Sequence, residues 1–207
     1  MGGLHKWSLI ALAFVCVLAA TGYFGWLAVN RGTGRGGTST SAVAIGGPFE
    51  LITSDGRLVT EQDFRGKPML IFFGYSFCPD VCPTELQKIS EALDLLGADA
   101  KKLHALFITI DPARDTAAVL RDYISNFHPN LVALGGSAAQ VSRAAKNYRV
   151  YFARSPNGPG ERDGNDKNYL MDHSAYIFLM DGQNRYLAHF SPSSGPKTIA
   201  QKVRQAF

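Results

Sequence analysis

The sequence predicts an α/β fold, a mixed sheet flanked by helices, together with a single N-terminal transmembrane helix. Two continuous apolar runs, residues 68–73 and 104–110, have the character of buried strands. The first is followed by residues 85–96, where apolar side chains recur at helical spacing. This alternation of strands with helices predicts βαβ units with parallel pairing. Residues 7–29 contain no charged residue and are long enough to cross a bilayer as a helix.

Residues 1–30 are therefore predicted to form a transmembrane anchor. A cleaved signal peptide is the competing interpretation, but the apolar run exceeds a usual signal-peptide core and no A-x-A pattern ends it. Aromatic residues near both ends, Trp7, Tyr23 and Trp26, suit the two membrane interfaces. Because the first apolar segment of a chain usually directs export, we expect it to lie in the cytoplasmic (inner) membrane. The rest of the chain is then expected on the extracytoplasmic, periplasmic side.

A flexible tether rich in Gly, Ser and Thr, residues 31–43, joins this segment to one domain, residues 44–207. The chain carries 21 Lys and Arg against 17 Asp and Glu. Three of the basic residues, Lys6, Arg31 and Arg35, precede the domain and no acidic residue does. The domain itself therefore holds 18 basic against 17 acidic residues. A charge so nearly balanced gives no reason to expect nucleic acid as a partner.

Short-range signals predict the other elements of the domain. Asp-Gly pairs at 55–56 and 181–182, each between short apolar runs, predict two hairpins. Elsewhere, continuous apolar runs indicate strands and helical spacing indicates helices. In chain order the predicted elements are strands 49–52 and 57–59, strand 68–73, helix 85–96, strand 104–110, a helix ending near 127, strand 131–134, helix 136–148, an extended stretch 149–153, a polar loop 155–169, strands 175–180 and 185–190, and helix 197–207.

Two cysteines lie where the strand 68–73 ends and the next helix begins. Cys78 falls in the connecting loop and Cys82 at the helix start, where the positive end of the helix dipole favours a thiolate. Such a pair can form a redox disulfide, exchange with another dithiol, or hold a soft metal. The alternative is two small buried side chains with no chemical role. It fits less well, because ligands bind at such strand–helix junctions in open α/β sheets.

A histidine that can complete a metal site follows the polar loop. His173 lies at the entrance of strand 175–180, and the long loop before it can carry the imidazole toward the cysteines. Two thiolates and one imidazole suit copper. A closed structural zinc site usually needs four protein ligands, and only two cysteines lie outside the apolar segment. From spacing alone, a loop histidine bonded to a backbone carbonyl explains His173 equally well.

Three motifs together resemble the Sco/SenC family. They are CPDVCPTE at residues 78–85, IDPARDT at 110–116 and DHS at 172–174, and the resemblance covers about residues 46–207. Members of this family are membrane-anchored, thioredoxin-like copper proteins needed to assemble cytochrome c oxidase. The resemblance implies a thioredoxin-like fold, copper in its Cu(I) and Cu(II) states as the bound metal, and as its ligands Cys78, Cys82 and His173.

The resemblance also implies a function and partners. The chain is predicted to deliver copper to the dinuclear copper centre of cytochrome c oxidase, as a metallochaperone more than as an enzyme. Its implied partners are the copper-centre subunit of the oxidase, a copper donor or thiol reductant, and the membrane through residues 7–29. The alternative is a thiol–disulfide oxidoreductase that keeps the oxidase's copper-ligand cysteines reduced. Such an enzyme needs no imidazole and usually has two residues between its cysteines, which also argues against a peroxidase of the peroxiredoxin type.

Acidic residues near the expected site are candidates for supporting roles. Asp111 ends the strand 104–110 and Asp172 precedes His173, so either can orient a ligand or a loop. For Asp115, helix N-capping by this residue or its neighbours is favoured, with an ion pair between the loop and Arg114 as a further structural role.

Overall fold

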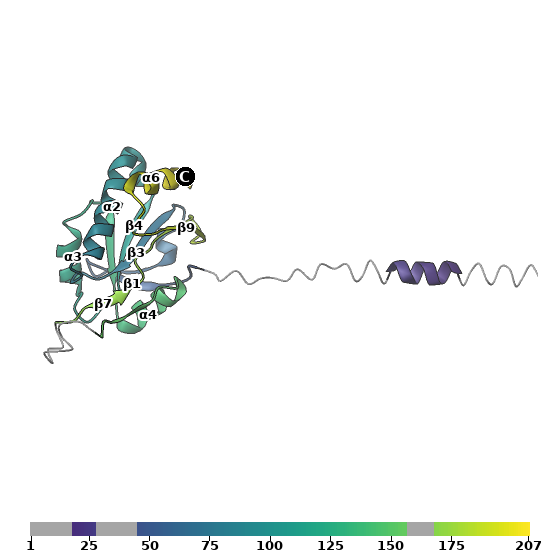
Figure 1. Cartoon of the computed structure of the whole chain (residues 1–207), viewed down its shortest axis with the longest axis horizontal. Coiled ribbons are helices and arrows are strands. Elements are labelled where there is room, and N and C mark those ends of the chain that lie inside the picture. Colours follow the sequence, from purple (N-terminus) through teal and green to yellow (C-terminus); the bar gives the residue numbers. More distant parts are fainter. Residues whose placement is uncertain (1–17, 28–44, 157–167) are drawn as a thin grey trace, which may run out of the picture. The chain divides into compact units, whose positions relative to one another are not determined.

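The computed structural model describes residues 18–27, 45–156 and 168–207 (Figure 1). The chain divides into two compact units, Met1–Ala42 and Val43–Phe207. Residues 18–27 are helical. Among the described residues, no helix has both the length and the apolar character that a membrane crossing requires. The predicted span 7–29 lies mostly outside the described residues and the tether 31–43 lies wholly outside them, so both stay predictions.

The second unit is built on a seven-stranded mixed sheet (Figure 1). The three central strands β5, β4 and β3 are parallel, β1 pairs antiparallel with β5 and β2, and β8 pairs antiparallel with β3 and β9. This confirms the mixed sheet and both predicted hairpins. In the spatial order β2-β1-β5-β4-β3-β8-β9 the strands are Leu58–Thr60, Glu50–Thr53, Leu131–Gly135, His104–Thr109, Met69–Gly74, Ile177–Met180 and Tyr186–Phe190.

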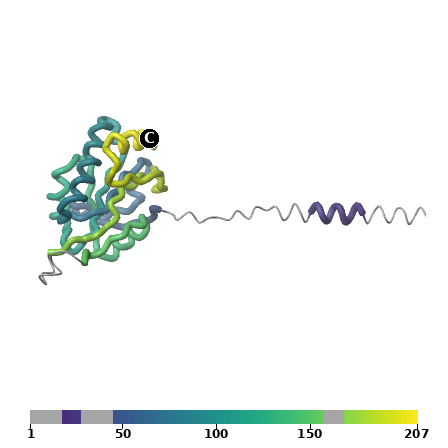
Figure 2. The backbone as a smooth tube through the Cα atoms, viewed as in Figure 1, coloured from purple at the N-terminus to yellow at the C-terminus, as the bar shows by residue number. Residues whose placement is uncertain are grey.

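Helices cover both faces of this sheet. Successive strand residues point to opposite faces, and Phe72 contacts Phe107 while Phe73 contacts Tyr148, the C-cap of α4. Phe107 in turn contacts Tyr123 of α3, so α3 and α4 lie on opposite faces. On the tube of Figure 2, α6 runs beside α2, against which it packs. The helices are α2 (Val81–Leu96), α3 (Ala117–Ile124), α4 (Ala138–Asn147) and α6 (Pro196–Arg204), with 3₁₀ turns η1 (Glu61–Phe64) and η2 (Gly97–Lys102).

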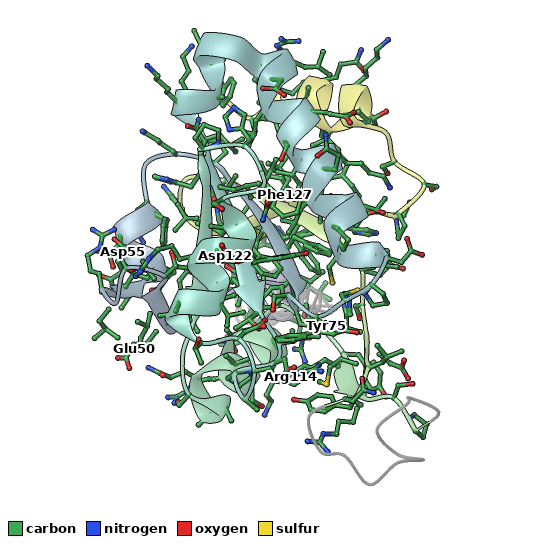
Figure 3. The ribbon with its side chains drawn as sticks, turned by 90° about the vertical axis from the view of Figure 1, so that its left-hand side faces the viewer. Glu50, Asp55, Tyr75, Arg114, Asp122 and Phe127 are labelled. Carbon is green, nitrogen blue, oxygen red and sulfur yellow. The ribbon has the colours of Figure 1, made fainter. Side chains whose placement is uncertain are left out.

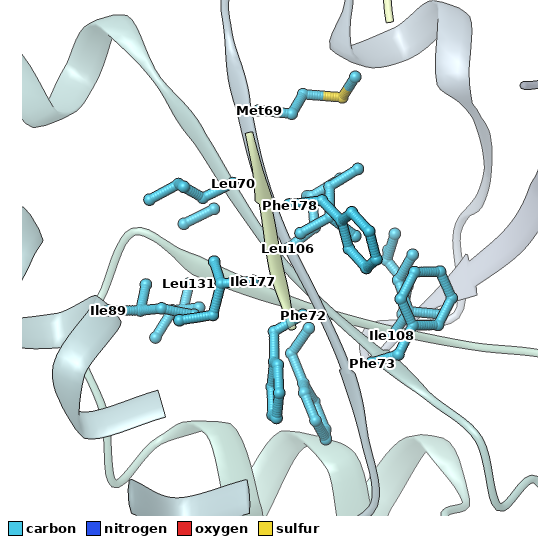
Figure 4. Close-up of a cluster of buried hydrophobic side chains, with 14 of the residues drawn as sticks. Met69, Leu70, Phe72, Phe73, Ile89, Leu106, Ile108, Leu131, Ile177 and Phe178 are labelled. Atoms are coloured by element: carbon cyan, nitrogen blue, oxygen red, sulfur yellow. The ribbon is translucent and has the colours of Figure 1, made fainter. Parts of the chain in front are cut away.

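The core is centred on β3, whose six residues are all buried (Figure 4). Phe72 and Phe73 have no exposed surface, and the strand has neighbours on both edges. A strand buried on both faces reads as a continuous apolar run, which is why the sequence identified it. The cysteine loop starts from Gly74, the buried last residue of this strand.

A small second sheet was not predicted. β6 (Phe152–Arg154) pairs antiparallel with β7 (Met171–His173), and the pairing sets Phe152 opposite His173. The sequence predicts only an extended stretch at 149–153 and places His173 in front of a strand, whereas His173 is the last residue of β7. Three-residue strands of mixed polarity carry no period that a sequence pattern can reveal, because their pairing comes from tertiary contact.

Candidate metal centre

The cysteine loop occupies the junction between β3 and α2. α2 begins at Val81, so Cys78 lies in the loop and Cys82 in the first helical turn, as predicted. Cys82 is fully buried and Cys78 is half-buried. A Cβ on Gly74 would lie 2.9 Å from the Cys82 sulfur and 3.0 Å from the ring of Phe107. Since real Cβ contacts are longer than this, glycine at the strand end makes room for the buried sulfur.

The strand β7 brings His173 to the two sulfurs. Its Nε2 lies 3.4 Å from the Sγ of Cys82, and its Nδ1 lies 3.0 Å from the carbonyl oxygen of Ser174. A carbonyl can only accept, so Nδ1 donates to it, and Nε2 is the ring nitrogen that faces the sulfurs and is placed to bind a metal. The edge of the ring packs against Tyr75 and Phe72, with centroid separations of 6.0 and 6.2 Å. His173 therefore makes both contacts that were alternatives in its sequence: one ring nitrogen bonds a backbone carbonyl and the other approaches a cysteine sulfur.

The potential ligand atoms of Cys78, Cys82 and His173 all lie within 4.8 Å of one another. Both cysteines are free thiols. Among the residues that the structure describes, these three side chains form the group of His, Cys, Asp or Glu residues that lie close enough together to share one metal ion. Two soft sulfurs and one imidazole are a donor set suited to copper, and three protein ligands leave a position open for an incoming one.

The comparisons with known proteins agree with this geometry. The family model described as SCO1/SenC matches residues 37–207. The chain belongs to the SCO1/SenC family.

Two curated relatives indicate the breadth of the family. A SCO2-like protein of Rickettsia felis is 40% identical over 162 residues, which cover 78% of this chain and 77% of the relative. The mitochondrial protein SCO1 of Saccharomyces cerevisiae is also 40% identical, over 176 residues that cover 84% of this chain and 55% of the relative.

Solved structures of the family match the fold. The structure of Bradyrhizobium japonicum ScoI with copper bound has a TM-score of 0.71 and 43% identity, covering 79% of this chain and all of that one. Yeast Sco1 with copper bound has a TM-score of 0.69 and 41% identity, covering 78% of this chain and 87% of that one. The thioredoxin-like fold expected of a SCO1/SenC domain is therefore confirmed.

The two thiols of this SCO1/SenC domain differ strongly in acidity. The hydrogen bond from the Cys82 thiol lowers the pKa of Cys78 to about 3, and contacts with His173 and with backbone N–H groups act in the same direction against burial. One of these donors is the backbone N–H of Cys82, 3.4 Å from the Cys78 sulfur. The same bond, with burial, raises the pKa of Cys82. The metal-free pair thus shares one proton, with the thiolate at Cys78.

This acidity predicts how Cys78 reacts as the pH changes. A thiol whose pKa is lowered is deprotonated at every pH above that value, so alkylation of metal-free Cys78 by iodoacetamide is expected to keep one rate between pH 8 and pH 6. An ordinary thiol would slow by roughly 100-fold over this interval. Mass spectrometry of the labelled peptide measures the rate. A slope like that of glutathione, run in parallel, would contradict the assignment.

Asp115 supports the cysteine loop instead of capping a helix. The N-cap of α3 is Thr116, whose side chain accepts from the N–H of Val119. Asp115 is buried and accepts hydrogen bonds from the backbone N–H of Ser76 at 3.1 Å and from its hydroxyl at 2.5 Å. A third bond comes from the hydroxyl of Thr109 at 2.5 Å. The helix cap predicted at Asp115 or its neighbours is made by the neighbour Thr116.

Removing this carboxylate is expected to destabilise the domain. Asp115→Ala removes the acceptor of three donors, one buried and two part-buried, and we expect the free energy of unfolding to fall by about 3 kcal/mol. Urea unfolding followed by circular dichroism measures it. Asp122→Ala, an exposed position on α3, is the matched control and is expected to stay within about 0.5 kcal/mol of the wild type. Equal free energies of unfolding for the two variants would show that Asp115 does not stabilise the domain.

The two other acidic candidates lie in different places. Asp111 is buried, and its oxygens accept from the hydroxyl of Tyr169 and from Nε of Arg114. The expected loop ion pair to Arg114 is therefore made by Asp111. Asp172 is exposed, and strand alternation directs its side chain to the opposite face of β7 from that of His173. Sequence reasoning missed Tyr75 and Tyr169 as neighbours of the site, because neither belongs to a recognisable motif.

Proposed function

We propose that this SCO1/SenC protein binds one copper ion through Cys78, Cys82 and His173 and passes it to the dinuclear copper centre of cytochrome c oxidase during assembly. The convergence of two sulfurs and an imidazole nitrogen within 4.8 Å is the observation that carries the proposal. The copper-bound states of the relatives from Bradyrhizobium japonicum and yeast support it. The assembly role follows from the family resemblance.

The site suits a cargo that must be released again. Thiolates hold Cu(I) strongly, while the three-ligand set leaves room for a ligand of the acceptor subunit. Cys78 is half-buried and Cys82 fully buried, so the acceptor would approach from the side of Cys78. Exchange of one thiolate at a time keeps the ion bound to protein throughout the transfer.

The cellular setting is part of the proposal. Residues 7–29 anchor the chain in the cytoplasmic membrane and the copper domain works on the periplasmic side, where the acceptor subunit exposes its copper centre. The uncharged apolar segment supports this arrangement. A reporter enzyme fused after Phe207 tests the orientation. A periplasmic reporter is expected to be active there, and activity of a cytoplasmic reporter alone would contradict the proposed orientation.

A copper titration tests the central claim. The purified full-length chain, in detergent and fully reduced, is titrated with Cu(I) against a competing chelator. One copper per chain is expected, with tight binding lost in Cys78→Ser. If the reduced wild type takes up no copper in competition with the chelator, the chaperone function is excluded.

One observation favours a second candidate function, thiol–disulfide exchange with a partner dithiol. The metal-free pair already holds a thiolate at Cys78 beside a protonated thiol at Cys82, the arrangement from which attack on a disulfide starts. In this function the partners are a thiol reductant and the oxidase subunit whose cysteines are to be reduced. Exchange that persists when copper binding is removed would identify it.

A further inference from the structure

Four side chains form a stack beside the metal centre. The guanidinium carbon of Arg114 lies 4.8 Å from the ring centre of Phe77 and 3.6 Å from that of Tyr169. The guanidinium carbon of Arg154 lies 4.0 Å from the ring centre of the same Tyr169. We call Phe77, Arg114, Tyr169 and Arg154 the aromatic–arginine stack. Its members come from the cysteine loop, the β4–α3 connection, the residues before β7, and β6.

Tyr169 is fixed in this stack at three points. Its ring contacts both guanidinium groups, its hydroxyl donates to Oδ1 of Asp111 at 2.6 Å, and its carbonyl oxygen accepts from Nη1 of Arg114 at 2.8 Å. Arg114 also bonds to Asp111, because its Nε donates to Oδ2 of Asp111 at 2.5 Å. Tyr169, Arg114 and Asp111 thus form a triangle in which each residue contacts the other two. Tyr169 is 6% and Asp111 3% exposed. Charged groups at this depth stay paired, so the triangle resists rearrangement.

The chain from Tyr169 to His173 transmits this fixed position to the imidazole. Its last three residues form β7, which pairs with β6, and the N–H of Met171 donates to the hydroxyl of Tyr75 at 3.1 Å. A strand rises roughly 3.3 Å per residue, so only a short segment separates Tyr169 from His173. We therefore expect a displacement of Tyr169 to move His173 as well. The other end of the stack, Phe77, adjoins Cys78. Arg114 also lies 5.7 Å from the ring centre of Tyr75, beside which it is seen in Figure 3.

We propose that Arg114 is a positioning residue for the metal centre: by holding Tyr169 and Asp111 it sets where Nε2 of His173 lies relative to the two sulfurs, and so how tightly copper is retained. The inference rests on the proposed copper-binding function and adds a residue from outside the ligand set. Arginine is required because a planar guanidinium stacks with its faces while donating hydrogen bonds from its edge. A lysine ammonium cannot do both.

Two variants separate the contribution of Arg114 from that of the hydrogen bond between Tyr169 and Asp111. Arg114→Lys keeps the charge but loses the stack and the paired donors, and is expected to weaken copper binding by about 10-fold. Tyr169→Phe keeps the ring and loses the bond to Asp111, so a smaller loss is expected. Arg185→Lys is the matched control, since Arg185 makes the same Nε-to-carboxylate contact, 2.7 Å to Asp181, in the exposed β8–β9 turn. It is expected to bind copper like the wild type.

A double-mutant cycle with His173→Ala distinguishes positioning from general support. Copper affinity of the full-length chain is measured by chelator competition for all four combinations, and thermal unfolding of each variant checks the fold. If Arg114 acts through His173, Arg114→Lys causes no further loss once the imidazole is gone. An equal loss in both backgrounds would mean that Arg114 merely supports the fold, and the inference would be overturned.

The outcomes also separate this inference from the proposed function. A wild-type chain that binds no copper overturns both. A wild type that binds copper, with Arg114→Lys and Tyr169→Phe binding it equally well, overturns the positioning role of Arg114 alone.

Discussion

Replacement of His173 by alanine is expected to weaken copper binding by at least about 100-fold, since loss of a ligand exceeds the 10- to 100-fold effect of losing a supporting contact. The substitution leaves two thiolates and removes the only nitrogen donor of the group. Chelator competition on the reduced full-length chain measures the loss. Exchange of the dithiol with a small disulfide is expected to survive, because that reaction needs the two sulfurs and no imidazole.

His189→Ala is the matched control for this experiment. His189 is exposed on β9, where its Nδ1 contacts the hydroxyl of Tyr186, and its removal is expected to leave copper affinity unchanged. Unchanged affinity in His173→Ala would remove the imidazole from the ligand set. A parallel loss of dithiol exchange would show instead that His173 serves the redox chemistry of Cys78 and Cys82.

Oxidation of Cys78 and Cys82 to a disulfide is expected to abolish copper binding altogether. The pair gives up two electrons and its one shared proton to the oxidant, for example oxidised glutathione, which becomes one glutathione thiol and one thiolate, and a bond forms between the two sulfurs. The two thiolate donors then no longer exist, and one imidazole cannot retain Cu(I). The measurement is copper content after desalting, with the loss of two hydrogens verified by intact mass. Reduction is expected to restore one copper per chain.

The Cys78→Ser variant provides the control, because it cannot form this disulfide. Treatment with the same oxidant is expected to leave its weak residual copper binding as it was before. Copper retained by the oxidised wild type would contradict the assignment of the two sulfurs as ligands. The experiment also relates the two candidate functions. Copper binding needs the two reduced thiolates, whereas thiol–disulfide exchange passes through the disulfide, so the chain cannot do both at the same time.

The sequence by itself determined the framework that presents the cysteines. The continuous apolar run of β3 marks a strand buried on both faces, and helical spacing after Cys82 marks α2, because hydrophobic periodicity is a local property of the chain. Asp-Gly pairs marked both hairpins for the same reason. The three motifs indicated the family and so the three candidate ligands, which periodicity could not have selected.

Only the tertiary structure decided how the metal centre is assembled and supported. The contact between Cys82 and His173 joins residues 91 positions apart, and it depends on the short strand β7, whose pairing with β6 no local pattern reveals. The same holds for Asp115, which bonds to Ser76 across 39 positions, and for Tyr169, which bonds to Asp111 across 58. These buried polar groups find partners only when distant segments meet. The folded sheet therefore fixes their roles, and the residue types alone do not.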